Sequence, residues 1–236
     1  MGQINKDTAI LIFSLSAQLE AERKSIFGNA NKKASRGFFN ILINRTRKIA
    51  SSTGADVIIV DESQQKGTTF GERYANAFQE LFDQGYTKVL SIGNDTPDLT
   101  AEVLDQAIDK IQHKDLVIGP STDGGVYLLG MRCEFFNLDQ FKALPWLEST
   151  LFNTLVNGVF WNRAKAYYFD ELTDIDTAHH LLQFLYSTDD EALISFILSH
   201  LLAVQNLIQH SKSLCLSDKH SFSFQLRGPP AFLLAA

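Results

Sequence analysis

Short apolar runs recur along most of the chain and alternate with longer segments in which apolar residues repeat every three or four positions. The runs predict buried strands at residues 9–14, 56–60, 88–92, 115–118, 127–131 and 164–169. The longer repeats predict helices at residues 38–50, 70–84, 100–111, 147–156, 177–186 and 190–209. Strands and helices that alternate at these lengths are typical of an α/β protein with a mostly parallel sheet between two helical layers.

Two segments depart from this alternation. Residues 16–36 are rich in charged side chains, and we expect a loop or a partly helical excursion outside the core. The last part of the chain has further helical spacing and then weak signals, with Pro229 and Pro230 excluding a helix near the end. We therefore expect one α/β domain at residues 1–186, and a C-terminal helical extension and tail packed on the same domain at residues 187–236.

Composition and charge narrow the class of protein. The 236 residues are 45% hydrophobic, which provides ample material for a core, and the formal net charge is −6. This acidic balance, without a basic stripe or a nucleic-acid-binding module, argues against nucleic acid as a partner. No apolar run is long enough to span a membrane, and no signal peptide is visible. Cys133 and Cys215 form neither a metal-binding spacing nor a disulfide framework, so we expect a reducing, cytoplasmic compartment.

The first candidate for chemistry is Asp95, which follows the predicted strand at 88–92 through Gly93 and Asn94. Open α/β sheets bind ligands beyond the carboxyl ends of their strands, and a carboxylate there can hold a divalent cation that bridges a diphosphate. Turn chemistry is the alternative, because Asn and Asp favour turns. We interpret Asp95 as a candidate catalytic and metal-binding residue.

Asp123 has a similar place after the predicted strand at 115–118 and is followed by Gly124 and Gly125. The two glycines permit the close approach of a ligand, although Asp-Gly is also an ordinary hairpin turn. We expect the strands before Asp95 and Asp123 to be parallel neighbours, so that both carboxylates reach one cavity. Asp123 is therefore the second candidate catalytic residue.

Two further pairs of residues leave alternatives open. Asp174 and Asp176 lie directly before a predicted helix, where either Asp176 or Thr177 caps the helix, or this turn supplies a second metal ligand, Asp176. Glu72 and Arg73 lie at the start of another predicted helix and either face the cleft or form a solvated pair. We therefore include Asp176 as a candidate metal ligand, and Glu72 and Arg73 as candidate nucleotide-binding residues. The alternatives are a helix cap for the first pair and a solvated ion pair for the second.

Five motifs, taken in order, resemble one bacterial family. They are spread over residues 56–182 and read FGERYANAF, GYTKVLSIGNDTPDL, LVIGPSTDGGVYLLG, W-x-x-S-T and DIDT. They resemble DUF2064, a family of uncharacterised glycosyltransferase-like proteins with a GT-A-type, Rossmann-like fold. The resemblance implies a three-layer α/β/α architecture of the nucleotide-diphospho-sugar transferase type. It also implies a nucleotide or nucleotide-sugar site with a divalent metal, Mg²⁺ or Mn²⁺, at Asp95.

The resemblance implies roles for other positions as well. It places five residues on the floor or rim of the cavity: Asp123, Gly124, Gly125, Glu72 and Arg73. Family members carry a first-strand loop with a glycine followed by Lys-Thr-Arg, which suits nucleotide phosphates, whereas the loop here reads SLSAQLEAERKSIFG. Arg23 and Lys24 are the basic residues that remain to bind a nucleotide there.

Three functions fit these features. The first is a glycosyltransferase with a nucleotide-diphospho-sugar donor, an unknown small-molecule acceptor and a divalent metal that offsets charge on the leaving diphosphate. The second is a nucleotidyltransferase of the guanylyl- or cytidylyltransferase kind, because those enzymes share an Asp-x-Pro turn on a similar sheet. The third is a degenerate family member that binds a nucleotide or another ligand without catalysis. A homodimer is compatible with all three.

Overall fold

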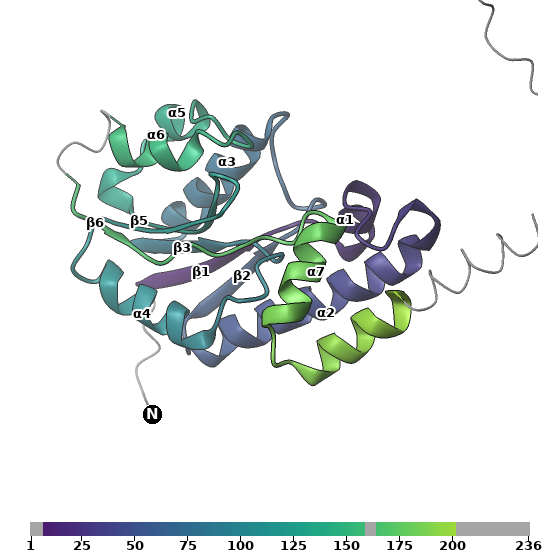
Figure 1. The fold of residues 1–236 in the computed structure, drawn as a ribbon. Coiled ribbons are helices and arrows are strands. Elements are labelled where there is room, and N and C mark those ends of the chain that lie inside the picture. The colour runs from purple at the N-terminus through teal and green to yellow at the C-terminus, as the bar shows by residue number, and fades with distance from the viewer. Residues whose placement is uncertain (1–6, 159–163, 202–236) are drawn as a thin grey trace, which may run out of the picture.

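The structure, a computed structural model, describes residues 7–158 and 164–201 of the 236-residue chain. Its centre is one six-stranded sheet with the strand order β2-β1-β3-β5-β4-β6 (Figure 1). The strands are β1 (Thr8–Phe13), β2 (Asp56–Val60), β3 (Lys88–Ile92), β4 (Leu116–Pro120), β5 (Val126–Arg132) and β6 (Ala166–Tyr168). Each lies within two residues of a predicted strand at both ends, and the predicted α/β fold class is confirmed.

Strand β5 is the exception to the parallel arrangement. It runs antiparallel to both neighbours, with Leu129 opposite Ser91 of β3 and opposite Ile118 of β4, while the other pairs are parallel. Only residues 121–125 join β4 to β5, and a connection this short permits only antiparallel pairing. The expectation that Asp95 and Asp123 follow neighbouring parallel strands is therefore wrong. Strands β3 and β4 nevertheless run in the same direction on either side of β5, so their carboxyl ends share one edge.

Helices cover both faces of the sheet, as Figure 1 shows, with α3, α5 and α6 on one side and α2 and α4 on the other. The helices are α1 (Ala17–Arg23), α2 (Lys32–Ser52), α3 (Phe70–Asp83), α4 (Ala101–Ile111), α5 (Leu138–Lys142), α6 (Leu151–Asn157), α7 (Ala178–Ser187) and residues 191–201. Short 3₁₀ turns occur at Asn29–Asn31 and Cys133–Phe135. Within the described ranges, no helix is both long and apolar enough to cross a membrane.

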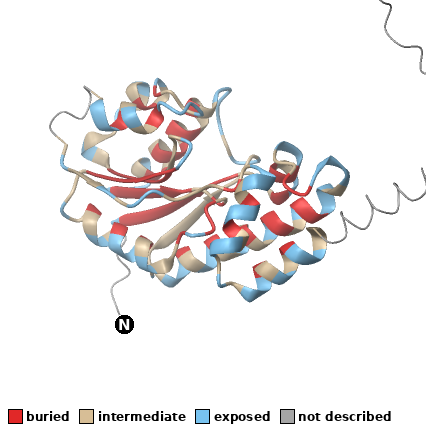
Figure 2. Cartoon of the chain, in the orientation of Figure 1, coloured by how far each residue is buried: buried red, intermediate tan, exposed pale blue. Residues whose placement is uncertain are grey.

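The central strands are buried on both faces, as the red strands of Figure 2 show. Along β1, Leu11 and Phe13 pack with α3 and α5, whereas Ile10 and Ile12 pack with α4. Successive side chains of a strand point to opposite faces, so an unbroken apolar run is what a strand between two helical layers requires. The run TAILIF therefore accounts for the central position of β1.

A third apolar cluster lies beside the sheet and corrects the expectation for residues 16–36. Ile26 and Phe27 are buried against α2 and α7, and α1 packs in the same cluster. The segment is therefore part of the core, because its few apolar residues point inward while most of its charged residues cover the outside. Helix α2 starts at Lys32, six residues before the predicted start at residue 38, for the same reason.

The helical residues 191–201 also pack on this cluster. Leu193 and Ile197 are buried there with Leu181 and Phe184 of α7. Residues 202–236, which include the rest of the predicted helix and the tail, lie outside the described residues.

Candidate functional site

A cavity of about 590 Å³ lies at the edge of the sheet where β1 and β3 end and β5 begins. It is lined by the acidic side chains Glu20, Asp95, Asp123, Glu148, Asp174 and Asp176, and by the basic side chains Arg23, Lys24 and Arg73. Both aspartates that define the predicted site therefore reach one cavity. Strand β5 lies between the strands that precede the two aspartates, but Asp95 and Asp123 are still at the same edge of the sheet.

Asp95 is positioned by the loop that follows β3. Its backbone carbonyl accepts a hydrogen bond from the N–H of Ile175 at 2.8 Å, which ties this loop to the segment before α7. The amide of Asn94 donates to the carbonyl of Leu15 at 3.3 Å and links the same loop to the end of β1. Gly93 has no side chain at a point where a Cβ would lie 2.9 Å from Asp95 Oδ1. The backbone of the Asp95 loop is therefore tied both to the segment before α7 and to the end of β1.

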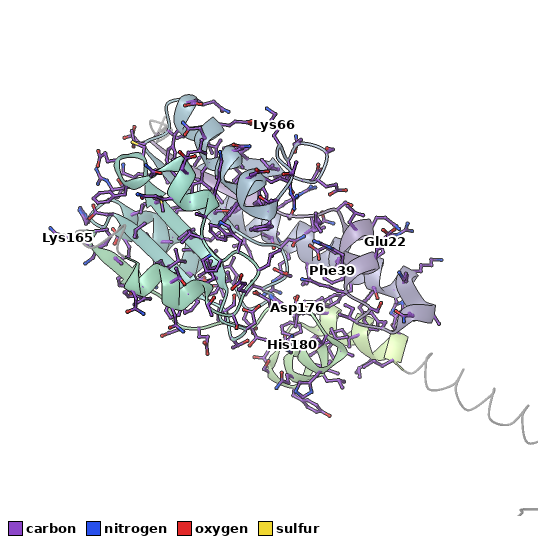
Figure 3. All side chains as sticks on the ribbon, turned by 90° about the horizontal axis from the view of Figure 1, so that it is seen from above. Glu22, Phe39, Lys66, Lys165, Asp176 and His180 are labelled. Atoms are coloured by element: carbon purple, nitrogen blue, oxygen red, sulfur yellow. The ribbon has the colours of Figure 1, made fainter. Side chains whose placement is uncertain are left out.

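The Lys24 ammonium forms the centre of the acidic side of the cavity. Its Nζ contacts the carboxylate of Asp95, lies 2.8 Å from Asp176 Oδ1 and lies 3.5 Å from Glu20 Oε2. It also lies 5.8 Å above the ring of Phe39 in α2, and Figure 3 shows Phe39 and Asp176 close together in the view from above. Burial alone would lower the pKa of Lys24, but the three carboxylates together raise it well above its ordinary value. The side chain is therefore a permanently charged, largely enclosed cation.

Asp174 ties together the loops around the cavity. Its carboxylate accepts hydrogen bonds from the hydroxyl of Thr96 and, at 2.7 Å, from that of Ser121. Burial and the nearby Asp95 carboxylate raise the pKa of Asp174 to about 7, although the two hydrogen bonds act in the opposite direction. The residue that caps α7 is Thr177, which accepts the N–H of His180 at 3.2 Å. Of the two expected caps, Asp176 and Thr177, the structure therefore has Thr177.

The turn between β4 and β5 places Asp123 at the cavity and Gly124 outside its lining. Asp123 is exposed, and its Oδ1 accepts the N–H of Gly125 at 2.8 Å. Gly125 lines the cavity, whereas Gly124 lies against the backbone of Ser149, where a Cβ would meet the carbonyl oxygen at 2.1 Å. The two glycines thus have different roles, one beside the cavity and one in the packing of the turn.

Glu72 and Arg73 point to different environments. The Glu72 carboxylate accepts the N–H groups of Thr68 and Thr69 and completes a capping box at the start of α3, outside the cavity lining. The hydrogen bonds from these residues, the Thr68 hydroxyl foremost, lower the pKa of Glu72 to about 2. Arg73 lines the cavity and donates to Gln65 Oε1 at 3.1 Å and to the Thr68 carbonyl at 2.9 Å. Only Arg73 of this pair therefore reaches the site.

Aromatic side chains also line the cavity, among them Phe70, Tyr74, Tyr127 and Trp146. Trp146 packs at ring distances of 5.0 Å from Tyr74 and 5.9 Å from Phe70, and its indole N–H donates to the Phe141 carbonyl at 2.7 Å. Tyr127 donates its hydroxyl to the Asp170 carbonyl at 3.1 Å. Burial, with Asp170 and Asp174 nearby, raises the pKa of Tyr127 to about 12, so this phenol stays protonated. The cavity therefore combines apolar, cationic and anionic surfaces.

The side chains at the cavity can be compared with the needs of the divalent metal that the resemblance implies. Asp95 and Asp176, the two predicted ligands, both direct carboxylate oxygens at the Lys24 ammonium. A divalent cation needs several oxygen ligands at once and would compete with this ammonium for the same oxygens. Within the described ranges, no group of three or more His, Cys, Asp or Glu side chains is arranged to hold a metal ion. With Lys24 in this position, the residues do not fit a divalent cation.

The contacts of Lys24 and the bridging role of Asp174 do not follow from the sequence patterns. Glu20 and Lys24 have the i, i+4 spacing of a helical ion pair, and this signal is readable once residues 17–23 are known to be helical. The hydrogen bonds of Asp174 to Thr96 and Ser121 have no such local signal, because they join residues 78 and 53 positions apart.

Comparison with known proteins agrees with this fold. The model of the family DUF2064, described as an uncharacterized protein conserved in bacteria, matches residues 43–148 and confirms the resemblance over that range. The matched range includes Arg73, Asp95 and Asp123 but not Lys24 or Asp176. Among curated proteins, no sequence matches this chain.

A solved structure shares the architecture. A candidate nucleotide-diphospho-sugar transferase from Desulfovibrio desulfuricans G20 superposes with a TM-score of 0.72 at 22% identity, covering 84% of this chain and 97% of that one. A manganese complex of Rv0371C from Mycobacterium tuberculosis H37Rv has a TM-score of 0.41 at 12% identity, covering 77% of this chain and 100% of that one. A cytidylyltransferase from Leptospira borgpetersenii has a TM-score of 0.39 at 13% identity, covering 92% and 99%. The first similarity confirms the fold, and the other two are too distant to bear on the site.

Proposed function

Because residues 43–148 match DUF2064 and the fold is that of a candidate nucleotide-diphospho-sugar transferase, we propose that this chain is a sugar transferase of that kind. It would bind a nucleotide-diphospho-sugar in the 590 Å³ cavity and transfer the sugar to a small hydroxyl acceptor. The observation that carries the proposal is the cavity at the carboxyl edge of β1 and β3, where α/β sheets bind their ligands. Basic, acidic and aromatic side chains meet in it.

Arg23 and Arg73 are the proposed phosphate contacts. Arg73 uses its Nε and Nη1 on Gln65 and Thr68, and a guanidinium with five N–H donors keeps others for a ligand. Arg23 is exposed beside Lys24 at the end of α1. Guanidinium groups bind phosphate through paired, charge-assisted hydrogen bonds, so these two side chains suit a diphosphate.

The acceptor is proposed to bind near Asp123. In the transfer, the acceptor oxygen forms a bond to the anomeric carbon, the bond from that carbon to the diphosphate breaks, and the acceptor hydroxyl loses its proton. Asp123 is exposed at the cavity and carries a carboxylate suited to orient the hydroxyl and accept this proton. Trp146 and Tyr74 supply an apolar wall against which a sugar ring can pack. A divalent metal is not part of this proposal, because Lys24 holds the carboxylates assigned to it.

Calorimetry with UDP, GDP and CDP tests nucleotide binding. We expect one of them to bind, and Arg73→Ala and Arg23→Ala each to weaken it by about tenfold, the effect of one lost charged hydrogen bond. Arg47→Ala is the control, since Arg47 is exposed on α2 and outside the cavity lining. If no nucleotide binds, the proposal fails.

Product analysis separates the catalytic alternatives. Release of a nucleoside diphosphate from a sugar donor supports the proposed reaction, and Asp123→Asn should reduce its kcat while leaving nucleotide affinity unchanged. Release of pyrophosphate from a nucleoside triphosphate would instead indicate a nucleotidyltransferase. Binding without either product would indicate a family member that has lost catalysis.

A further inference from the structure

Lys24 stands where the family resemblance leads one to expect a metal ion. Its ammonium contacts Asp95 and Asp176, the two carboxylates predicted to be metal ligands, and lies beside Glu20 as well. We propose that Lys24 is the resident cation of this site, and that it replaces a divalent metal in making the acidic side of the cavity compatible with a nucleotide diphosphate. The part that concerns the nucleotide rests on the proposed function, whereas the part that concerns the cation does not.

The first support is the charge of the cavity. Six acidic and three basic side chains line it, so an anionic ligand needs the acidic side to be neutralised. Lys24 contributes the positive charge nearest to Asp95 and Asp176. Without the ammonium, Asp95 and Asp176 would repel a diphosphate at close range.

The second support is that Lys24 is built into the fold. Its backbone N–H donates to the Glu20 carbonyl at 2.8 Å and closes the end of α1. At the other end of the helix, the N–H of Ser16 donates to Glu62 Oε2 at 2.6 Å. The Lys24 side chain is only 17% exposed and reaches over the ring of Phe39. A metal ion would have to displace an enclosed ammonium from three carboxylates, an obstacle that an exposed lysine would not present.

The third support is the position of the neighbouring basic residue. Arg23 precedes Lys24 directly, yet no ion pair to it is found within the described part of the chain, and its side chain is exposed. One residue of the pair thus lies toward the carboxylates and the other toward solvent at the cavity. Lys24 therefore neutralises the carboxylates, and Arg23 remains available to bind phosphate.

A metal titration tests the inference. Mn²⁺ is titrated into metal-free protein and its binding is followed by electron paramagnetic resonance. The proteins compared are wild type, Lys24→Met, Lys24→Arg and the double variant Lys24→Met/Asp95→Asn. Lys48→Met, at an exposed position on α2 outside the cavity lining, is the control. We expect Lys24→Met to bind Mn²⁺ about tenfold or more tightly than wild type, because it leaves carboxylates around an uncharged side chain. Lys24→Arg should behave like wild type, and Asp95→Asn should remove the gain.

Nucleotide titrations in EDTA and in Mn²⁺ complete the test. Wild-type affinity for the nucleoside diphosphate should be the same in both, whereas Lys24→Met should lose about tenfold in EDTA and recover it with Mn²⁺. Wild-type protein that binds Mn²⁺ as tightly as Lys24→Met would overturn the inference, and so would a Lys24→Met variant that folds but gains no Mn²⁺ binding. If Lys24→Met does not fold, the wild-type Mn²⁺ titration decides alone: absence of tight binding supports the resident lysine and tight binding refutes it. If no nucleotide binds wild type, the proposed function is refuted. The Mn²⁺ titration then still tests whether Lys24 is the resident cation of the site.

Discussion

At the scale of single residues, the β4–β5 turn shows how one glycine positions a wall of the cavity. Gly124 has a φ of +87°, and its carbonyl accepts the N–H of Phe152 at 2.9 Å. A Cβ at this position would lie 2.1 Å from the carbonyl oxygen of Ser149. The close approach of these two backbones fixes Asp123 next to the segment that carries Trp146.

Gly124→Ala tests this packing. We expect a loss of about 2 kcal/mol or more in the free energy of unfolding, because left-handed strain and a backbone clash act together. Gly54→Ala is the matched control, since Gly54 has a φ of +74° and a Cβ there would have no atom within 4 Å. This control should lose only about 1 kcal/mol. Urea denaturation measures both, and equal losses would show that the Ser149 contact adds nothing.

Asp174 makes stability depend on pH. Its pKa is raised to about 7 in the folded protein, and Asp95, Asp123 and Tyr127 are the titratable groups nearby. An acid whose folded pKa is raised stabilises the protein at low pH and loses this contribution as the pH rises from about 4 to about 7. Asp174→Asn should therefore gain stability relative to wild type over this window, by at most about 1.4 kcal/mol per pH unit. Denaturation series at several pH values check the slope, and a difference that does not vary with pH would contradict the raised pKa.

At the scale of elements, the start of α3 separates a structural role from a binding role. Thr69 and Glu72 form a reciprocal capping box, and the next residue, Arg73, lines the cavity. The family resemblance places Glu72 at the rim of the nucleotide site, yet its carboxylate is occupied by the backbone and hydroxyl of the preceding turn. Two consecutive residues of the helix therefore differ in role: Glu72 binds the backbone of the preceding turn, whereas Arg73 lines the cavity.

Thr69→Ala should cost about 0.5–2 kcal/mol through the lost cap. Glu72→Ala should also destabilise the protein at neutral pH, and its effect should shrink as the pH falls from about 4.5 toward 2, because the depressed pKa of this carboxyl is the stabilising contribution. Nucleotide affinity should stay unchanged in Glu72→Ala and fall in Arg73→Ala. Thermal denaturation measures the stability and calorimetry measures the nucleotide affinity. Reduced affinity in Glu72→Ala would show that Glu72 does contribute to nucleotide binding.

Elements differ in how well the sequence predicts them. The strands and α3 follow from local periodicity, because an apolar run or a repeated spacing reports directly which faces are buried. Helix α1 does not, because at seven residues it is too short for a convincing repeat and most of its side chains are charged or carry an amide. Its burial depends on α2 and α7, and α7 lies far along the chain.

At the scale of the whole molecule, residues 191–201 extend the core that α1 and α2 begin. Ile197 is fully buried in the cluster with Phe38 and Phe39, while the next residue, Leu198, is 43% exposed. This packing favours a single cooperative unit in which the helical residues 191–201 support the segment that carries Lys24.

Ile197→Ala should lower the free energy of unfolding by about 2–5 kcal/mol, the cost of truncating a buried aliphatic side chain. Leu198→Ala, one position along the same helix, should cost much less. Circular dichroism and tryptophan fluorescence should report the same unfolding midpoint. Two separate transitions would indicate that these helices fold apart from the sheet.

The sequence by itself determined the α/β class, the strands and the placing of Asp95 and Asp123 at strand ends, because these features depend on local periodicity and turn chemistry. Only the tertiary structure decided that β5 lies antiparallel between β3 and β4, that Glu72 caps a helix, and that Lys24 lies among the expected metal ligands. Lys24 and Asp95 are 71 residues apart, and no local pattern reports which side chain will meet another across that distance. The physical reason is that such a contact depends on how the loops between the elements pack. That packing is set by interactions throughout the fold and not by the residues next to either side chain.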